Sequence, residues 1–359
     1  MHLLAPEQYD RVQPIFASMA EVHLNTAAVL SGDCPGQAYA DNPDAPRTAL
    51  IVADDCYYLA GDTHNQACNA ALNAFLPGET YFILFCDTEL WRPALDGLLQ
   101  HKYAVPGTRR YYVFEQPLLP DWPARVPEGF SVEKVDAALL ARGLQHTDGL
   151  LEGITCTWRT LDLFYQKGFG SCLVHGDEVA AWSLCDFVSG SRCEIGVNTR
   201  REYRRLGLGT LAAAATASYA AARGLTAIGW HCWANNAGSV GIAEKVGFAL
   251  ANHYDVYTNH WPAENATDMT TDQFRAFAEM YERWFEADPP SSGLAHWVAA
   301  TAWALAGERG RCFRQLHRAV DTGWLRSVAQ LRERWPQFLM DCQREQPEEW
   351  KTLRARLTD

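Results

Sequence analysis

A glycine-containing turn, Arg204-Arg205-Leu206-Gly207-Leu208-Gly209-Thr210, could bind an anion. It follows an apolar segment at 193–197 that predicts a strand, and it opens an alanine-rich segment at 211–222 that predicts a helix. Glycines let the backbone approach a ligand closely, and the unpaired N–H groups at a helix start point in one direction. The sequence therefore predicts a pyrophosphate-binding loop here, with an ordinary tight turn as the alternative.

This turn differs from two common phosphate-binding patterns. A dinucleotide-binding fold requires a third glycine where Ala212 stands, and a phosphate loop requires a Gly-Lys-Ser/Thr run that the chain lacks. Downstream, residues 227–233 predict a buried strand, and a short helix follows that ends at Gly247, a residue suited to a helix C-cap. A further strand is predicted over 250–257.

Together, the turn and the downstream helix resemble the GNAT superfamily of acetyl-coenzyme A-dependent N-acetyltransferases. The matching residues are Arg204-x-x-Gly207-x-Gly209 and Asn236-x-x-Ser239-x-x-x-Ala243-Glu244-Lys245-Val246-Gly247-Phe248. The chain most resembles a bacterial subgroup that includes zwittermicin-resistance-like acetyltransferases. The subgroup's features are a Gly-Phe-Gly strand at 168–170, a Thr-x-x-x-Tyr-Arg turn at 199–204 and a Trp-x-Cys strand at 230–232. The match covers about 127–260, and a weaker one reaches back to about Thr48.

The resemblance implies acetyl-coenzyme A as cosubstrate, and no metal is expected. The backbone amides of the loop would bind the pyrophosphate, and the strand before the loop would pair with the pantetheine arm. Two arginines would add charge, and two polar residues would contact the coenzyme from the next helix. The alternatives are solvated loop arginines and, for Asn236, a helix cap. The predicted coenzyme-binding residues are Val197, Thr199, Arg204, Arg205, Leu206, Gly207, Leu208, Gly209, Thr210, Asn236 and Ser239.

Transfer to an amine also requires proton movement. An alkyl amine with a pKa of about 10.4 is mostly protonated at neutral pH, so a base has to remove a proton before attack. Glu194 is the first candidate base, because the superfamily often places a glutamate on this strand, and His231 is the second. The alternatives are a surface or salt-bridged carboxylate for Glu194 and a core histidine for His231.

The leaving thiolate needs a proton as well. Many superfamily members carry a tyrosine seven residues beyond the motif asparagine, but this chain has Ala243 there. We predict Tyr254 as the general acid, with a water molecule or Ser239 as other donors and simple packing on the sheet as the alternative role for Tyr254. The resemblance implies that the subgroup lacks this tyrosine as well. The absence of the tyrosine therefore does not by itself mean an inactive enzyme.

The order of predicted elements gives an α/β (α+β) fold in three parts, a GNAT mixed sheet flanked by helices being the central one. Residues 1–123 alternate strands and helices without a glycine loop and resemble a degenerate GNAT-like half, which would cover the catalytic sheet or wall the acceptor pocket. Residues 127–260 form the catalytic domain. Residues 271–359 are helical and include one tetratricopeptide-like pair, which would pack on the enzyme or bind a partner.

Composition favours a cytoplasmic enzyme. Hydrophobic residues make up 48% of the 359 residues, and the net charge of −12 argues against broad binding to nucleic acids or anionic membranes. Eleven cysteines without a C-x-x-C pair predict reduced thiols, and no apolar run is long enough to span a bilayer. A homodimer is compatible with the sequence, which does not define the oligomeric state.

These observations predict an acyl-coenzyme A-dependent N-acyltransferase in which a small amine attacks the thioester directly in a ternary complex. The acidic balance is compatible with a polyamine, an amino sugar or an amine antibiotic as acceptor. One alternative is transfer from an aminoacyl-tRNA, for which Arg200, Arg201, Arg204 and Arg205 form the compact basic run. Another is a non-catalytic acyl-coenzyme A sensor that presents its C-terminal helices to a partner.

Overall fold

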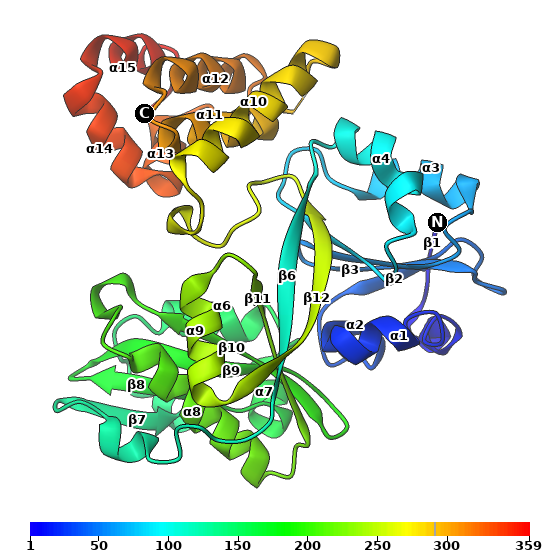
Figure 1. Ribbon diagram of the computed structural model, residues 1–359, viewed down its shortest axis with the longest axis vertical. Helices are drawn as coiled ribbons and strands as arrows, with labels where there is room; N and C mark the ends of the chain where they lie inside the picture. The colour runs from blue at the N-terminus through cyan, green and yellow to red at the C-terminus, as the bar shows by residue number, and fades with distance from the viewer. Residues whose placement is uncertain (291) are drawn as a thin grey trace. The chain divides into compact units, whose positions relative to one another are not determined.

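The computed structural model describes residues 1–290 and 292–359 and contains one mixed sheet. Within these residues the sheet has twelve strands in the order β1-β2-β3-β4-β5-β12-β6-β11-β10-β9-β8-β7 (Figure 1). The strands are β1 (His2–Leu3), β2 (Gln37–Ala40), β3 (Thr48–Ala53), β4 (Cys56–Gly61), β5 (Ile83–Cys86), β6 (Val105–Phe114), β7 (Phe130–Lys134), β8 (Gly170–His175), β9 (Glu178–Ser189), β10 (Arg192–Thr199), β11 (Ala227–Trp233) and β12 (Phe248–Thr258).

Helices connect the strands and make up the C-terminal region. Those between strands are α1 (Ala17–Val22), α2 (Leu24–Leu30), α3 (Gln66–Phe75), α4 (Trp91–His101), α5 (Ala137–Leu140), α6 (Asp148–Thr155), α7 (Leu161–Lys167), α8 (Leu208–Ala222) and α9 (Ala237–Val246). Those after the sheet are α10 (Thr271–Ala287), α11 (Gly293–Leu305), α12 (Arg309–Asp321), α13 (Val328–Arg334), α14 (Pro336–Glu345) and α15 (Pro347–Arg354). Short 3₁₀ turns are η1 (Pro6–Arg11), η2 (Trp122–Arg125), η3 (Arg201–Tyr203) and η4 (Ala266–Asp268).

The predicted mixed α/β sheet with a helical C-terminal region is confirmed, and the sheet is continuous. Strand β6, from the N-terminal part of the chain, pairs antiparallel with β11, with Tyr111 opposite His231. Strands β10 and β11 are parallel, whereas β9 and β10 are antiparallel. The N-terminal part therefore extends the same sheet that carries the predicted glycine loop.

The contacts divide the chain into two compact units. The first comprises Met1–Cys68, Leu84–Trp91 and Thr108–Val256, and the second comprises Asn69–Ile83, Arg92–Gly107 and Tyr257–Asp359. All of the predicted site residues belong to the first unit, so the site can be described within that unit alone.

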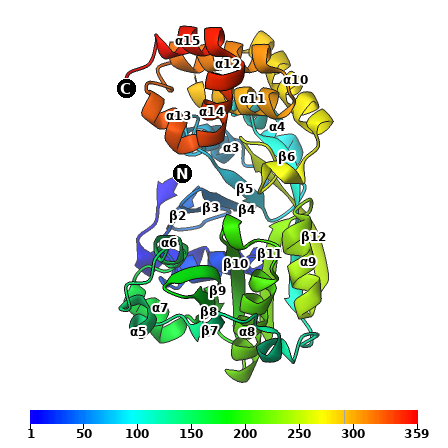
Figure 2. The ribbon, with the colours of Figure 1, turned by 90° about the vertical axis from the view of Figure 1, so that its left-hand side faces the viewer.

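The alanine-rich helix α8 lies on strands β8, β9 and β10 (Figure 2). Its residues Ala212, Ala213 and Ala217 are completely buried, because small side chains let the helix approach the sheet closely. The buried Thr216 hydroxyl donates a hydrogen bond to the Ser183 carbonyl at 3.1 Å. This packing fixes the N-terminus of α8, and therefore the glycine loop, against the end of β10.

Two helices near the N-terminus, α1 and α2, were not among the predicted elements. They are short, and they meet at His23, which ends α1 and precedes the first residue of α2. Helix α2 packs on β9 and β10 in the first unit. Such short helices give a weak periodic signal, and their position depends on tertiary packing.

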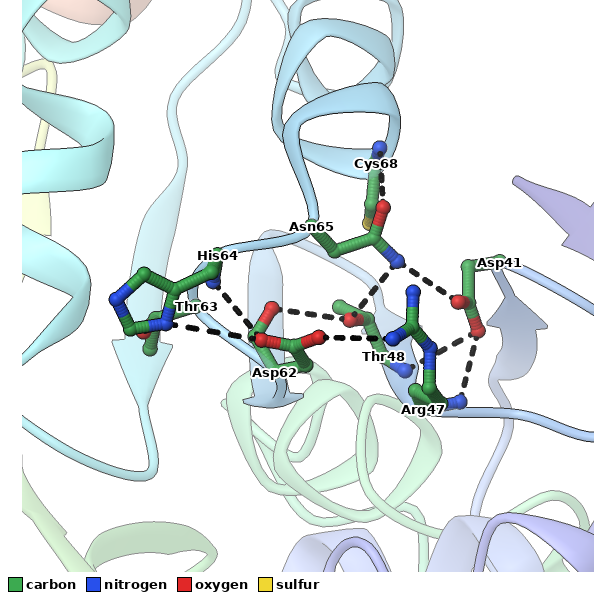
Figure 3. A network of polar contacts seen from close by, with 8 residues as sticks. All are labelled: Asp41, Arg47, Thr48, Asp62, Thr63, His64, Asn65 and Cys68. Carbon is green, nitrogen blue, oxygen red and sulfur yellow. Dashed lines mark hydrogen bonds and ion pairs between the residues drawn. The ribbon is translucent and has the colours of Figure 1, made fainter.

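A polar network ties the strand ends of this N-terminal part together (Figure 3). The Asp41 carboxylate accepts hydrogen bonds from the amides of Arg47 and Thr48, at 2.9 and 3.1 Å, and from the Asn65 side chain at 2.7 Å. The Asn65 side-chain oxygen in turn accepts from the Cys68 amide at the start of α3. These contacts are structural, since they satisfy backbone donors at a turn and a helix start.

In the second unit, helices α10 to α15 group around one apolar core (Figure 2). On α10, Phe274, Phe277 and Tyr281 are buried in this core. Helices α11 and α12 form the predicted pair, joined at Gly307 with φ of 80°. Among the residues that the structure describes, no helix combines the length and apolar character needed to cross a membrane.

Candidate active site

The predicted loop between β10 and α8 adopts a left-handed backbone conformation at Gly207, which favours glycine. Gly207 precedes α8 with φ of 80°, and Arg205 also has a positive φ, of 68°. The Leu211 amide donates to the Gly207 carbonyl at 3.1 Å as the first turn of the helix closes. The amides of residues 208–210 precede that bond and therefore have no acceptor within the helix. This is the donor arrangement that an anion needs.

At Gly209, helix α8 passes close to β10. A Cβ atom added there would lie 2.7 Å from Thr199 Oγ1, 3.3 Å from Ile242 Cδ1 and 3.5 Å from Val197 Cγ2. Any larger residue would therefore push the helix from the strand or fill the space beside the loop. The structure thus brings together Val197, Thr199 and Gly209, three of the predicted coenzyme-binding residues.

Strands β10 and β11 separate beside this loop. Their parallel pairing joins residues 192–194 to residues 227–229, whereas β10 continues to Thr199 and β11 to Trp233. The other edge of β10 stays paired with β9 as far as Thr199. In the part of the chain that the structure describes, the edge of β10 that faces β11 therefore has no partner strand beyond Glu194. An extended ligand can pair with such an edge as an added strand does.

The arginines of the loop lie at the surface. Arg204, Arg205 and Leu206 are exposed, and the Arg204 side chain donates to the Thr199 carbonyl at 3.3 Å. Arg200 instead forms an ion pair with Glu178. The loop thus offers exposed positive charge from Arg204 and Arg205 beside its free amides.

Asn236 and Ser239 both have contacts within the protein. The Asn236 side chain accepts a hydrogen bond from the Ser239 amide at 3.0 Å and caps helix α9. The Ser239 hydroxyl accepts from the Trp230 indole at 3.0 Å. Asn236 therefore caps helix α9, as the alternative interpretation predicted. A contact between Asn236 and the coenzyme would be in addition to this cap.

The three candidate catalytic residues lie together in one chain of contacts. The Tyr254 hydroxyl lies 2.8 Å from His231 Nδ1, and His231 Nε2 lies 3.4 Å from Glu194 Oε1. Glu194 is 8% exposed and is the last residue of β10 paired with β11, so its carboxylate lies where the strands begin to separate. Gly229 leaves the space for it, because a Cβ there would lie 3.1 Å from Glu194 Cγ.

The contacts of His231 define its tautomer when neutral. Nε2 lies 3.0 Å from the Val22 carbonyl, an atom that can only accept, so Nε2 carries the hydrogen. Nδ1 then accepts the hydrogen of the Tyr254 hydroxyl. Tyr111 stacks on the imidazole with ring centroids 4.6 Å apart and holds the ring in this orientation.

Tyr254 is protonated and held from a second side. Burial raises the pKa of Tyr254 to about 12, although the positive charge of Arg109 opposes the rise. Arg109 Nε donates to the Tyr254 hydroxyl at 3.3 Å, and its guanidinium lies over the Trp233 ring. At neutral pH, Tyr254 therefore has a proton that it can donate.

The junction of α1 and α2 completes this group, and none of its residues was among the predicted site residues. The Leu24 amide donates to Glu194 Oε1 at 2.7 Å. The buried His23 ring stacks on His231 at 5.4 Å and meets Tyr254 edge-on at 4.7 Å. Burial, followed by the charge of His231, lowers the pKa of His23 well below its ordinary value. No local pattern marks these residues, because their contacts span some 170 to 230 positions in sequence.

Comparisons with known proteins identify the family of the chain. The family model described as GNAT acetyltransferase matches residues 14–257. An uncharacterized N-acetyltransferase, YdfB, from Bacillus subtilis (strain 168) is 25% identical over 235 residues, which are 64% of this chain and 88% of YdfB. A crystal structure of a GCN5-related N-acetyltransferase-like protein from Streptococcus suis has a TM-score of 0.57 and 24% identity, covering 70% of this chain and 98% of that one. The matched region contains every predicted site residue, and the chain belongs to the GNAT acetyltransferase family.

Proposed function

We propose that this N-acetyltransferase transfers the acetyl group of acetyl-coenzyme A to a small amine by direct attack in a ternary complex. The observation that carries the proposal is the position of Glu194. This buried carboxylate lies where β10 and β11 separate, upstream of the free strand edge and the glycine loop. A base at this position would stand beside a thioester bound along β10.

The residues present fit the coenzyme. The amides of residues 205–210, with Arg204 and Arg205, would hold the pyrophosphate, and the edge of β10 from Val197 to Thr199 would hold the pantetheine arm. Gly209 supports this fit, because a side chain there would occupy the space between α8 and these strand residues. When bound, the coenzyme supplies an acetyl group activated as a thioester.

Glu194 would remove the proton from the acceptor amine. One carboxylate oxygen, Oε1, is held by the Leu24 amide and lies near His231, so the side chain has a fixed orientation. As the new nitrogen–carbon bond forms and the carbon–sulfur bond breaks, the ammonium nitrogen loses two protons in all. One would leave through Glu194 to solvent, and the other would replace the proton that Tyr254 gives to the thiolate. His231 links the carboxylate to Tyr254 and would orient both.

Tyr254 would protonate the leaving thiolate in place of the tyrosine that many family members carry. Ala243 stands at that position and is completely buried, so the helix offers no acid there. A thiol with a pKa of about 8.5 leaves as a thiolate at pH 7 with a penalty of about 2 kcal/mol, which a donated proton offsets. Arg109 and His231 hold the Tyr254 hydroxyl for this role.

The absent helix tyrosine also supports a second candidate, an acyl-coenzyme A sensor without turnover. We favour the enzyme because Glu194, His231 and Tyr254 form a connected group, which a sensor does not need. The finer resemblance to zwittermicin-resistance-like acetyltransferases supports an amine antibiotic among the acceptors. A tRNA donor is less favoured, since Arg200 in the basic run is paired with Glu178.

Thiol release from acetyl-coenzyme A, measured with a panel of amines, tests the proposal. The expected result is amine-dependent release of coenzyme A, with a product heavier by one acetyl group in mass spectrometry. Tight binding of acetyl-coenzyme A in calorimetry without release on any amine would support the sensor instead.

A further inference from the structure

One carboxylate beside Glu194 has no part in the mechanism above. Asp186 lies on β9, where the pairing with β10 shifts: Phe187 faces Glu194, and Cys185 faces Ile195. Asp186 is therefore the extra residue of a β-bulge. Bulges change the direction of a side chain and are frequent next to active sites.

The Asp186 side chain reaches the backbone of β10 at Gly196. A Cβ atom added to Gly196 would lie 2.8 Å from Asp186 Oδ2 and 3.3 Å from Oδ1. Gly196 lies two residues beyond Glu194, on the stretch of β10 whose other edge has separated from β11. The carboxylate thus lies beside the part of the strand that the thioester would follow, and the glycine leaves room for it.

In the part of the chain that the structure describes, no basic side chain pairs with this carboxylate. Across residues 1–290 and 292–359, no hydrogen bond or ion pair to Asp186 is found. Burial, followed by the negative charge of Glu194, raises the pKa of Asp186 well above its ordinary value. Arg159, which lies near Cys34, donates to the carbonyls of Gly32 and Cys34 instead. A carboxylate that is removed from solvent and has a purely structural role normally has a hydrogen-bond or ion-pair partner.

We propose that Asp186 binds the ammonium group of the acceptor, and that the acceptor is an alkyl amine that enters the site as a cation. The inference rests on the proposed function, because it concerns the same site. The ammonium supplies the missing counter-charge and lies between Asp186, which binds it, and Glu194, which takes its proton. Acceptors with a carboxylate beside the amine are repelled by both groups.

Cyclohexylamine and aniline provide a matched test, since the two ring amines have similar shape but only the first is a cation at neutral pH. Wild-type protein is expected to show the higher kcat/KM for cyclohexylamine. Asp186→Asn should lower that value about 10- to 100-fold, mainly through KM, because it removes a hydrogen bond between charged groups. The kcat/KM for aniline should change less than about twofold, because aniline is neutral and makes no hydrogen bond between charged groups with Asp186. Asp162→Asn, at an exposed position on α7, is the control variant.

A preference of the wild-type enzyme for aniline, or an equal loss for both amines in Asp186→Asn, would overturn the inference while leaving the acetyltransferase proposal intact. If neither amine is acetylated, calorimetry of cyclohexylamine with the coenzyme A-saturated protein decides. Binding that Asp186→Asn weakens supports the role of Asp186, whereas no binding, or binding that the variant leaves unchanged, contradicts it. Failure of the proposed function itself appears separately, as absent thiol release with every amine in the panel.

Discussion

The two sides of the proposed site are built in different ways. In the proposal, the coenzyme side would use main-chain amides of residues 205–210 and the edge of β10, which are close together in the sequence. The acceptor side would instead use side chains from β6, β9, β10, β11 and β12, with the Leu24 amide at the α1–α2 junction holding one of them. Backbone recognition tolerates changes of side chain, provided that the glycines remain. The acceptor side depends on each side chain and can change specificity without altering the loop.

The largest expected effect is a loss of turnover when the proposed base on the acceptor side is replaced. Glu194→Gln should lower kcat about 100- to 10,000-fold, the usual contribution of a general base. Glutamine keeps an oxygen for the Leu24 amide, so the fold and the affinity for acetyl-coenzyme A should be retained. Steady-state kinetics and calorimetry measure the two quantities, with Glu152→Gln, at an exposed position on α6, as the control. If Glu194→Gln kept the wild-type kcat, another residue would have to be the general base.

A break on the coenzyme side should affect binding instead. Gly209→Val places atoms against Thr199 and Ile242 and should weaken acetyl-coenzyme A about 10- to 100-fold, in line with an overpacking cost of about 1–3 kcal/mol. Gly241→Ala on α9 is the matched control, because an added Cβ there meets open space. Calorimetry and a thermal melt separate lost binding from lost folding. If a folded Gly209→Val protein bound acetyl-coenzyme A with unchanged affinity, the coenzyme would have to bind away from this loop.

Tyr254→Phe tests the acid and should have a smaller effect. Loss of the donated proton should lower kcat about 10- to 30-fold at pH 7, matching the penalty of about 2 kcal/mol for a free thiolate. Since the Tyr254 pKa is about 12, the wild-type residue stays protonated as pH rises through neutrality. The deficit of the variant should therefore shrink as pH approaches the pKa of the thiol. Tyr219→Phe, at an exposed site on α8, is the control, and a deficit independent of pH would argue for a packing role.

The smallest effect concerns stability at the α1–α2 junction. The pKa of His23 is lowered in the folded protein, so below the ordinary value of 6.5 the unfolded chain binds a proton that the folded chain does not. Stability should therefore fall as pH falls below 6.5, by at most about 1.4 kcal/mol per pH unit for this group. His23→Gln should flatten the slope of denaturant stability against pH, whereas His64→Gln, at a 93% exposed side chain, should not. His260, whose pKa burial lowers to about 4, acts in the same direction in all three proteins. Equal slopes would exclude His23 as the source.

These two sides also differ in how far the sequence predicts them. The glycine loop, strand β11 and the cap at Gly247 are local, and each was predicted within a few residues of its observed bounds. Glu194, His231 and Tyr254 were proposed separately, and their contact follows from strand order, which periodicity does not encode. Leu24, Arg109 and Asp186 carry no local signal: an amide, a strand arginine and a bulge residue become significant through tertiary pairing.

Hydrogen exchange at peptide resolution, with and without saturating acetyl-coenzyme A, tests the central claim most directly. We expect slower exchange in residues 195–210, because among the described residues the β10 edge beyond Glu194 has no partner strand and the amides of 208–210 have no acceptor within α8. Exchange in α11 and α12 should not change. Saturating coenzyme that leaves exchange at 195–210 unchanged would contradict binding by these main-chain groups.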